Sequence, residues 1–584
     1  MLATVARSVR ASWFAPLLVP AVLGGCAQEI AEPTQGLAVV IKAPLGADSP
    51  FANPDVKFVA LIAEGPGIST DPNQAPAVVV PYSGPGQQMA MPAVPYGPAR
   101  QIRVELYPAD ANGLPTFPVL GRGRTVPKDV DTGSTHLVQA YVMRTNNWAA
   151  PVSDQTQEAK TDARVGLGAE LQPDGSVVLA GGAEIADNKV SPLEPQALGK
   201  MSQTVLRYDS SARVLQNLSA PPVSAVLSTG RALMATASGA DGQIVFSGGY
   251  VQGDLGPVAS NLMEYWDPAE AKIKQSGAGA AHLEYARAHH TVTRLFDAQE
   301  YYMVVGGKGP QAEAAVSWEI WHPLYGRLQK GSLSKARWNH AAVRLPEKDG
   351  GYIMLIGGEN DAGPIDDFEV LRYDTAGNVS FKGNKKVTCA IGGTSHNGPD
   401  SNEKCAALKD QPGYVPFYWE PLIRKLGGGI ARTLPGAAFV SSAEANQIYI
   451  VGGYADAAHT QPLSRVDVFD IVKGDYLGSV PQLESARGAP QLAVTRGGNQ
   501  AGRVIVTGGL DASGRTLAKA EVLYYDAAAA VTKREWADGE VPGGGRVAAK
   551  ALGLSTGQVM VVGGASATDG VFVAADRIGL YNPR

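Results

Sequence analysis

A Gly-Gly pair returns seven times in this sequence, each time at the end of a short apolar run, and it constrains the fold more than any other feature. One such run is typical of any buried strand. Seven of them, at a spacing of about 50 residues, predict a repeat architecture. The runs read VVLAGG, IVFSGG, YMVVGG, IMLIGG, IYIVGG, VIVTGG and VMVVGG, and the pairs are Gly181-Gly182, Gly248-Gly249, Gly306-Gly307, Gly357-Gly358, Gly452-Gly453, Gly508-Gly509 and Gly563-Gly564.

Each repeat carries three further landmarks. An arginine precedes the Gly-Gly pair by 17 to 21 residues, a short turn often containing Asp-Gly follows, and a later strand ends in an aromatic residue and a small polar one. With a last, variable segment, this order predicts four antiparallel strands joined by tight turns. The arginines are Arg164, Arg231, Arg287, Arg337, Arg432, Arg487 and Arg546.

This order of landmarks resembles the Kelch repeat, and the resemblance covers residues 147–584. It implies an all-β fold, a seven-bladed β-propeller. The glycines would permit a close approach of neighbouring backbone, and the aromatic residues would cover that bare surface. The resemblance also implies that the seven arginines are structural and hydrogen-bond backbone between blades, although a ring of arginines could otherwise be an anion site.

The ends of the repeat region predict how the ring closes. The last repeat stops at its third strand, IGLYNPR (578–584), so its fourth strand is missing. The segment TNNWAAPV (145–152) resembles the fourth-strand segment KREWADGEVP (533–542), with Trp148 matching Trp536. We therefore expect residues near Trp148 to supply the outer strand of the last blade, which would leave no open edge.

Residues 36–146 lack the Gly-Gly repeat and predict a separate domain. Six short apolar segments broken by Pro and Gly favour an antiparallel β-sandwich. By length and pattern it resembles immunoglobulin-like or transthyretin-like modules of bacterial surface proteins. The segments are 36–44, 56–65, 75–82, 87–97, 99–109 and 134–144.

The first 25 residues read as a targeting segment. Two arginines precede an apolar run, and Leu23-Gly24-Gly25-Cys26 resembles a bacterial lipobox. This predicts lipidation of Cys26, an envelope location and a tether over residues 26–35; an ordinary secretion signal is the alternative. Ala27 favours the outer membrane by the sorting rule of enteric lipoproteins. The acyl chains would be the membrane attachment.

Cys389 and Cys405 are the two other cysteines. In an exported chain such a pair predicts a disulfide; two free thiols or a metal site are the alternatives. Neither residue lies in a predicted blade strand, which disfavours a copper enzyme of the galactose-oxidase type, since that family carries a Cys-Tyr crosslink. We expect no metal and no cofactor.

An insertion at 384–431 interrupts the repeat between the fourth and fifth blades. We expect it on the propeller face that carries the long loops, where binding residues concentrate. It holds an aromatic run, Tyr414, Phe417, Tyr418 and Trp419, which either packs the insertion onto the propeller or contacts a partner.

Histidines and acidic residues give weaker signals. His290 and His340 each follow a repeat arginine by three residues, which predicts structural positions, and His289 should face the other way. The acidic stretch with Glu359, Asp361, Asp366 and Asp367 either binds calcium or is a solvated loop.

These features favour an envelope-anchored scaffold that contacts a protein or a glycan through the long-loop face. The net charge of −5 gives no reason to expect nucleic acid as a partner. No common hydrolase, phosphate-loop or zinc-protease motif occurs. The alternative is a carbohydrate-active enzyme, similar to the sialic-acid mutarotases with their Kelch propellers, with its site at the channel mouth.

Overall fold

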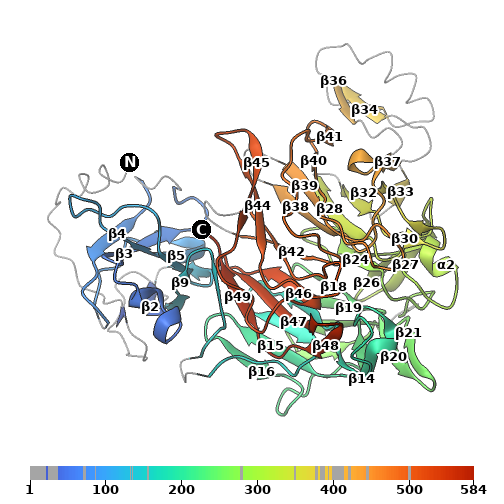
Figure 1. The fold of residues 1–584 in the computed structure, drawn as a ribbon, viewed down its shortest axis with the longest axis horizontal. Coiled ribbons are helices and arrows are strands. Elements are labelled where there is room, and N and C mark those ends of the chain that lie inside the picture. Colours follow the sequence, from blue (N-terminus) through green and yellow to red (C-terminus); the bar gives the residue numbers. More distant parts are fainter. Residues whose placement is uncertain are drawn as a thin grey trace.

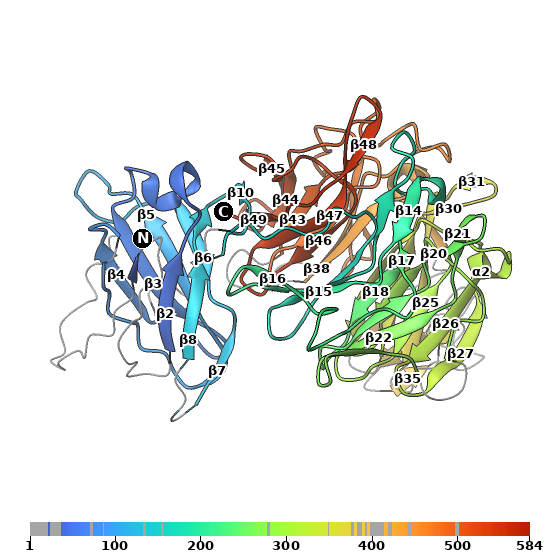
Figure 2. The same cartoon turned by 90° about the horizontal axis from the view of Figure 1, so that it is seen from below.

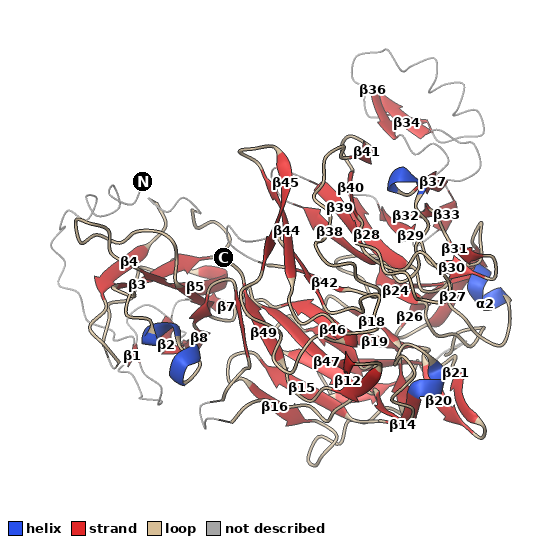
Figure 3. Cartoon of the chain, viewed as in Figure 1, coloured by secondary structure: helices blue, strands red, loops and turns tan. Residues whose placement is uncertain are grey.

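The protein is nearly all β, as Figure 3 shows. The structure is a computed structural model that describes residues 22–23, 37–69, 74–85, 87–131, 133, 136–153, 157–276, 281–347, 350–374, 379–381, 388–391, 394–396, 414–417, 423–441, 446–496 and 502–584. Within these ranges the helices are short: α2 (Glu313–Val316), η1 (Gly46–Asp48), η2 (Pro50–Ala52), η3 (Pro195–Ala197) and η4 (Gly427–Gly429). None of the described helices could span a bilayer.

Seven antiparallel sheets, counted over the described residues, follow one another along the chain from residue 168, and each has a row of four strands. We number them sheets 1 to 7. Sheet 1 contains β11 (Gly168–Leu171), β12 (Val177–Ala180), β15 (Val205–Asp209) and β16 (Val214–Asn217); sheet 2 contains β18 (Ala235–Ser238), β19 (Ile244–Ser247), β22 (Met263–Asp267) and β23 (Lys272–Lys274); sheet 3 contains β24 (Thr291–Arg294), β25 (Tyr302–Val305), β26 (Ser317–His322) and β27 (Gly326–Ser332). Sheet 4 contains β28 (Ala341–Glu347), β29 (Gly350–Ile356), β32 (Asp367–Asp374) and β33 (Val379–Phe381); sheet 5 contains β38 (Gly436–Ser441), β39 (Asn446–Val451), β40 (Val466–Asp470) and β41 (Asp475–Tyr476). Sheet 6 contains β42 (Gln491–Val494), β43 (Val504–Thr507), β44 (Glu521–Asp526) and β45 (Val531–Trp536); sheet 7 contains β46 (Val547–Gly553), β47 (Val559–Thr568), β49 (Gly579–Asn582) and β10 (Asn147–Ala149). Two of the sheets have a fifth strand beside that row, β48 (Val571–Ala574) on β47 and β37 (Ile423–Lys425) on β32.

The sheets stand in a propeller-like ring (Figures 1 and 2). The first strand of each sheet contacts the first strand of the next, and β46 of sheet 7 contacts β11 of sheet 1. Apolar side chains fill the gaps between neighbouring sheets. Trp266 of sheet 2, for example, packs with Val178 of sheet 1, and Trp321 of sheet 3 packs with Tyr265 of sheet 2. The core is therefore a set of wedges between sheets.

The expected closure of the ring is confirmed. β10 pairs with β49 as the outer strand of sheet 7, and Trp148 lies opposite Tyr581. The two rings stack with their centroids 5.3 Å apart, and Tyr581 Oη donates a hydrogen bond to Asn146 Oδ1 at 2.6 Å. The first strand of the ring region is thus the last strand of its last sheet.

A closed ring of backbone hydrogen bonds joins the sheets at the repeat landmarks. The N–H of the second glycine in each pair donates to the carbonyl of the next repeat's arginine, and Gly564 of the last repeat donates to Arg164 of the first at 2.8 Å. All seven bonds are present. Their N···O distances are 2.8 Å for Gly182 to Arg231, 2.9 Å for Gly249 to Arg287, Gly307 to Arg337, Gly453 to Arg487 and Gly509 to Arg546, and 3.0 Å for Gly358 to Arg432.

These bonds explain why the pairs are glycine. Both glycines have a positive φ in every repeat. In six repeats a Cβ on the first glycine would meet the next arginine's carbonyl oxygen too closely, as Gly357 would meet Arg432 at 2.6 Å, and in the seventh Gly563 would meet Leu167. No side chain fits where the backbones approach this closely.

The arginine side chains stay within their own sheets, so the expectation that they bond backbone between blades is wrong for the guanidinium groups. Arg287 Nη1 donates to the carbonyl of Gly306 at 2.8 Å. Counting this one, six of the seven repeats have a bond from the arginine Nη1 to the carbonyl of the first glycine of the same repeat. Five arginines also pair with a buried carboxylate of their own third strand, because a buried guanidinium needs a compensating charge. The pairs are Arg231–Glu264, Arg287–Glu319, Arg337–Glu369, Arg432–Asp467 and Arg487–Glu521.

The N-terminal residues form two sheets around one apolar core, which includes Val39, Leu61 and Val104. The first sheet contains β1 (Val22–Leu23), β2 (Leu37–Lys42) and β8 (His136–Tyr141), and the second contains β4 (Ala77–Pro81), β3 (Phe58–Glu64), β5 (Gly97–Tyr107), β6 (Gly121–Arg124) and β9 (Met143–Arg144), with β7 (Lys128–Val130) beside β5.

Two expectations for this domain are wrong. β2 and β8 run parallel, because β3 to β7 lie between them in sequence and the chain can enter both in one direction. Residues 87–96 form no strand, since Pro92 and Pro95 lack the N–H that a ladder needs. Met89 and Val94 still contribute side chains to the core.

The N-terminal domain packs directly against sheets 7 and 1 (Figure 2). Asn582 Nδ2 donates to the carbonyls of Met143 at 2.9 Å and Arg122 at 3.0 Å. The guanidinium of Arg213 lies 4.8 Å from the Tyr141 ring centroid. These buried contacts fix the domain to the ring.

The insertion leaves from the perimeter of sheet 4, so its expected placement on the long-loop face is wrong. β33 pairs with the second half of β32, and β37 (Ile423–Lys425) pairs with the first half. The two segments together occupy the outer-strand position, and the insertion interrupts that strand. β34 (Thr388–Ile391) and β36 (Tyr414–Phe417), with β35 (Thr394–His396), form a small sheet beyond it (Figure 1).

Most of the remaining short strands lie in the long loops after the Gly-Gly pairs. They are β13 (Ala183–Ile185), β14 (Leu198–Met201), β20 (Tyr250–Gly253), β21 (Gly256–Ala259), β30 (Glu359–Asn360), β31 (Gly363–Pro364) and β48 (Val571–Ala574). β17 (Arg231–Ala232) holds a repeat arginine and pairs with β20.

The close approach at the glycines predicts a stability effect. We expect Gly508→Ala to cost more than about 3 kcal/mol, because its Cβ would overlap the Arg546 carbonyl. The matched control Gly514→Ala shares the positive φ but meets no atom within 4 Å, and should cost about 1–2 kcal/mol. Urea unfolding followed by Trp fluorescence measures both, and equal losses would contradict this account.

Candidate functional site

The residue two positions after each repeat arginine adopts a left-handed backbone conformation at the centre of the ring. Its φ lies between 50° and 63° in all seven repeats. Several of these residues are joined from sheet to sheet, as Leu233 N donates to Gly166 O at 2.7 Å and Leu434 N donates to Asn339 O at 2.9 Å. The seven are Gly166, Leu233, His289, Asn339, Leu434, Ala489 and Ala548.

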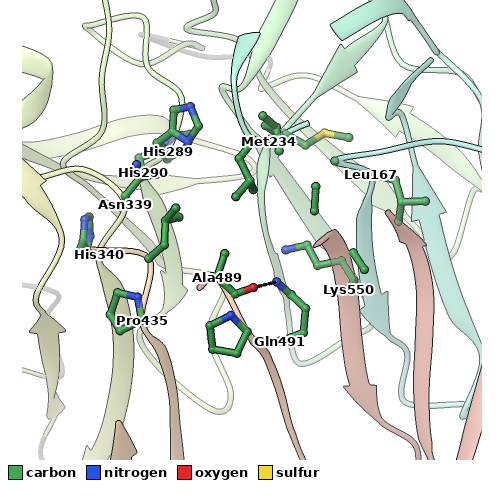
Figure 4. Close-up of a pocket in the computed structure, with 17 residues that line it drawn as sticks. Leu167, Met234, His289, His290, Asn339, His340, Pro435, Ala489, Gln491 and Lys550 are labelled. Atoms are coloured by element: carbon green, nitrogen blue, oxygen red, sulfur yellow. Dashed lines mark hydrogen bonds between the residues drawn. The ribbon is translucent and has the colours of Figure 1, made fainter. Parts of the chain in front are cut away.

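These residues and their immediate successors line a central cavity of about 310 Å³ (Figure 4). This volume is at the lower end of the range for small-molecule pockets. Every sheet contributes to the wall, and Leu193 comes from the loop after the first Gly-Gly pair. The fourteen repeat residues are Gly166, Leu167, Leu233, Met234, His289, His290, Asn339, His340, Leu434, Pro435, Ala489, Pro490, Ala548 and Ala549, and Gln491 and Lys550 complete the lining.

Two histidines of the wall carry unsatisfied ring nitrogens. His290 and His340 are each 7% exposed. Their Nε2 atoms lie 2.9 Å from Ser247 Oγ and 3.0 Å from Thr291 Oγ1, which links each ring to the preceding sheet. Their Nδ1 atoms are buried and have no hydrogen-bond partner among the described residues. A buried polar atom without a partner is costly, so it is a candidate ligand contact.

The pocket histidines are neutral at physiological pH. Burial lowers the pKa of His289 to about 4 and that of His340 to about 3, where the charge of Arg337 adds to the effect. Burial, with Arg287 second, holds the pKa of His290 well below its usual value. A neutral imidazole offers one N–H donor and one acceptor. This pairing matches a hydroxyl group, which is also both a donor and an acceptor.

Lys550 supplies a positive charge to the same cavity. Figure 4 shows its ammonium group extending from β46 into the pocket. No ion pair joins it to a carboxylate among the described residues. The carboxyl group of Glu170 lies near Lys550, and Thr236 Oγ1 donates a hydrogen bond to Glu170 Oε1 at 2.6 Å. Burial raises the pKa of Glu170, although the positive charges of Lys550 and Arg496 act to lower it. Lys550 is therefore available to an anionic group of a ligand.

An ionic cluster that we call the rim latch sits at the edge of the pocket. His459 lies between two carboxylates, with Nδ1 3.7 Å from Glu194 Oε1 and Nε2 3.4 Å from Glu359 Oε2. Burial would lower the pKa of His459, but the two carboxylates outweigh it and raise this pKa to about 9. Glu359 Oε1 accepts hydrogen bonds from Trp338 Nε1 and Asn339 Nδ2, both at 2.9 Å.

The structure divides the residues that the sequence singled out. The repeat arginines and glycines lie in the framework, and His289, His290 and His340 all line the pocket. The acidic stretch is neither one calcium loop nor solvated throughout: Glu359 belongs to the rim latch, Asp367 pairs with Arg337 and Lys335, and Asp366 pairs with Lys425. Among the described residues no group of three or more His, Cys, Asp or Glu is placed to hold a metal ion.

Other predicted residues lie outside what the structure describes. Cys26, Cys405, Tyr418 and Trp419 fall outside the described ranges, while Cys389, Tyr414 and Phe417 lie in β34 and β36, whose side chains are not described. The lipidation, the disulfide and the aromatic contact stay predictions.

Sequence reasoning missed the rim latch and the buried acids. For part of this cluster the sequence does hold a signal that could have been used: the position after each Gly-Gly pair is polar or aromatic in the second to fifth repeats. These residues are Tyr250, Lys308, Glu359 and Tyr454. His459 and Glu194 come from irregular loops without a shared register, so no pattern in the sequence could bring them together.

Comparison with known proteins gives only distant structural matches. No known family model matches the chain, and no curated protein matches its sequence. One solved structure, of a protein called YjhT, is 12% identical and aligns over 64% of this chain and 99% of its own, with a TM-score of 0.37. A copper-bound fungal alcohol oxidase of the AA5 family is 13% identical over 73% of this chain and 75% of its own, with a TM-score of 0.42. At this level of similarity, function has to be inferred from the residues of this chain.

The rim latch predicts a pH dependence. The folded pKa of His459, about 9, is above the ordinary value of 6.5, so its ion pairs stabilise the fold fully below pH 6.5 and are lost as the pH rises through about 9. We expect His459→Gln to lower the urea midpoint at pH 6 and to leave it unchanged at pH 10. An NMR titration of His459 should also show a lower pKa in Glu359→Gln, and an unchanged value would contradict the assigned contacts.

Proposed function

We propose that this chain is an envelope lipoprotein that binds a single sugar unit bearing a carboxylate in its central pocket. We propose further that the ring is a seven-bladed Kelch-type propeller over residues 147–584, carried by an immunoglobulin-like or transthyretin-like sandwich over residues 36–146. The sequence favoured a scaffold that contacts a protein or a glycan through the long-loop face, with a carbohydrate-active enzyme at the channel mouth as the alternative; of these ligands we now propose the glycan. The pocket now supports it better than a protein contact on the insertion.

The observation that carries the proposal is the pair of unsatisfied Nδ1 atoms on His290 and His340 in the wall of the cavity. A neutral imidazole, with one donor and one acceptor, suits a hydroxyl group, which also donates and accepts. Leu167 and Met234 lie across the pocket from these histidines (Figure 4), and their apolar side chains suit the C–H face of a sugar ring.

Lys550 favours an acidic sugar over a neutral one. Its ammonium group forms no ion pair among the described residues, and burial raises the pKa of the nearby Glu170 carboxyl, so a ligand carboxylate would supply a closer negative charge. Hydrogen bonds between charged groups contribute about 1.5–3 kcal/mol, roughly a 10- to 100-fold change in affinity.

Binding of galacturonic acid and galactose, measured by titration calorimetry, tests the proposal. We expect wild type to bind the acid more tightly than galactose, and Lys550→Met to weaken the acid by about 10- to 100-fold while sparing galactose. His340→Leu should weaken both sugars. Lys473→Met, an exposed cation with a side chain 68% exposed, is the matched control. Equal affinity of wild type and Lys550→Met for the acid would overturn the role of the lysine.

The proposed anchor has a separate test. We expect wild type in a Gram-negative host to incorporate labelled palmitate and to fractionate with the outer membrane. Cys26→Ser should do neither, because the acyl chains are the proposed attachment. Cys389→Ser is the control, and membrane retention of Cys26→Ser would contradict lipidation.

A further inference from the structure

The loop between the second and third strands of sheet 1, residues 183–203, extends across the mouth of the central pocket. It starts and ends as a small hairpin, in which β13 pairs with β14. Between these strands it touches other repeats. The carbonyl of Asn188 accepts a hydrogen bond from Phe572 N of sheet 7 at 2.7 Å, and η3 contacts β21 in the loop of sheet 2.

The tip of the loop reaches the far side of the ring. Glu194 lies 3.7 Å from His459, which belongs to the loop of sheet 5. The charge of Lys308, in the loop of sheet 3, also acts on its carboxyl and, after the contact with His459, helps to lower its pKa. One loop thus interacts with residues of the second, third, fifth and seventh repeats.

Leu193 occupies the pocket itself. Of the residues that line the cavity, it is the one that does not come from the short segment after a repeat arginine. It packs, partly buried, with the apolar cluster of the mouth, which includes Leu198, Tyr250 and Tyr454. The neighbouring Pro192 and Pro195 restrict the backbone on both sides of Leu193 and Glu194.

We propose that loop 183–203 is a lid that limits the central pocket to one free sugar unit, with Leu193 setting the size limit and the contact between Glu194 and His459 holding the lid closed. The ligand class rests on the proposed function; the lid itself rests on the contacts above. A closed lid leaves no exit for a chain attached to the enclosed sugar. The protein would therefore select free sugars over units within a polymer.

The lid can be tested without any ligand. A thiol placed in the pocket by Gln491→Cys is labelled with a small maleimide, and peptide mapping reports the rate at that position. We expect Glu194→Gln and His459→Gln each to speed this labelling by about tenfold, and Leu193→Ala to speed it as well. A thiol at the exposed Ala528 of sheet 6 is the reference, and its rate should not change. Thermal melts of every variant show whether the ring stays folded.

A second arm measures selection by size. Wild type should bind galacturonic acid at least tenfold more tightly than trigalacturonic acid, and Leu193→Ala should reduce that ratio to about two. Unchanged labelling in folded Glu194→Gln and Leu193→Ala variants would overturn the lid, whatever the sugar result. Faster labelling with no sugar bound by any variant would keep the lid and overturn the proposed function.

Discussion

The whole ring depends on one backbone hydrogen bond repeated seven times, from the second glycine of each Gly-Gly pair to the carbonyl of the next arginine. The bond requires two backbones to approach so closely that a Cβ is excluded, which explains the glycines. It also fixes each arginine segment at the inner edge of its sheet. The guanidinium group then has to be buried, and the buried carboxylates of the third strands compensate its charge in five repeats.

Because the arginine segment is fixed, the left-handed residue two positions after each arginine and the residue that follows it always reach the centre of the ring. The framework therefore places fourteen residues around one cavity without specifying their side chains. In sheets 3 and 4 these positions hold histidines and an asparagine, and in sheets 1, 2, 5 and 6 they hold small or apolar residues. Binding chemistry can vary at these positions while the hydrogen bonds that close the ring are preserved.

The repeat pattern was sufficient to predict the strand order and the closure by the Trp148 segment, because glycine pairs and arginines report directly on backbone geometry. It was insufficient for the site. His459 and Glu194 come together only because of the paths of two irregular loops. The sequence also could not show that Glu359, rather than one of its acidic neighbours, contacts His459. The insertion was misplaced because β37 restores the outer strand of sheet 4, a pairing that three residues cannot signal in sequence.

The strand that closes the ring has a consequence for biosynthesis. β10 precedes the other strands of sheet 7 by about 400 residues, and its partner strand in the sheet is β49. A ribosome makes the chain from its N-terminus, so β10 is finished long before its partner exists. Sheet 7 can assemble only after β49 has been synthesised, and until then sheets 1 and 6 each lack a neighbour. Closure of the ring is thereby tied to the synthesis of the few residues of β49.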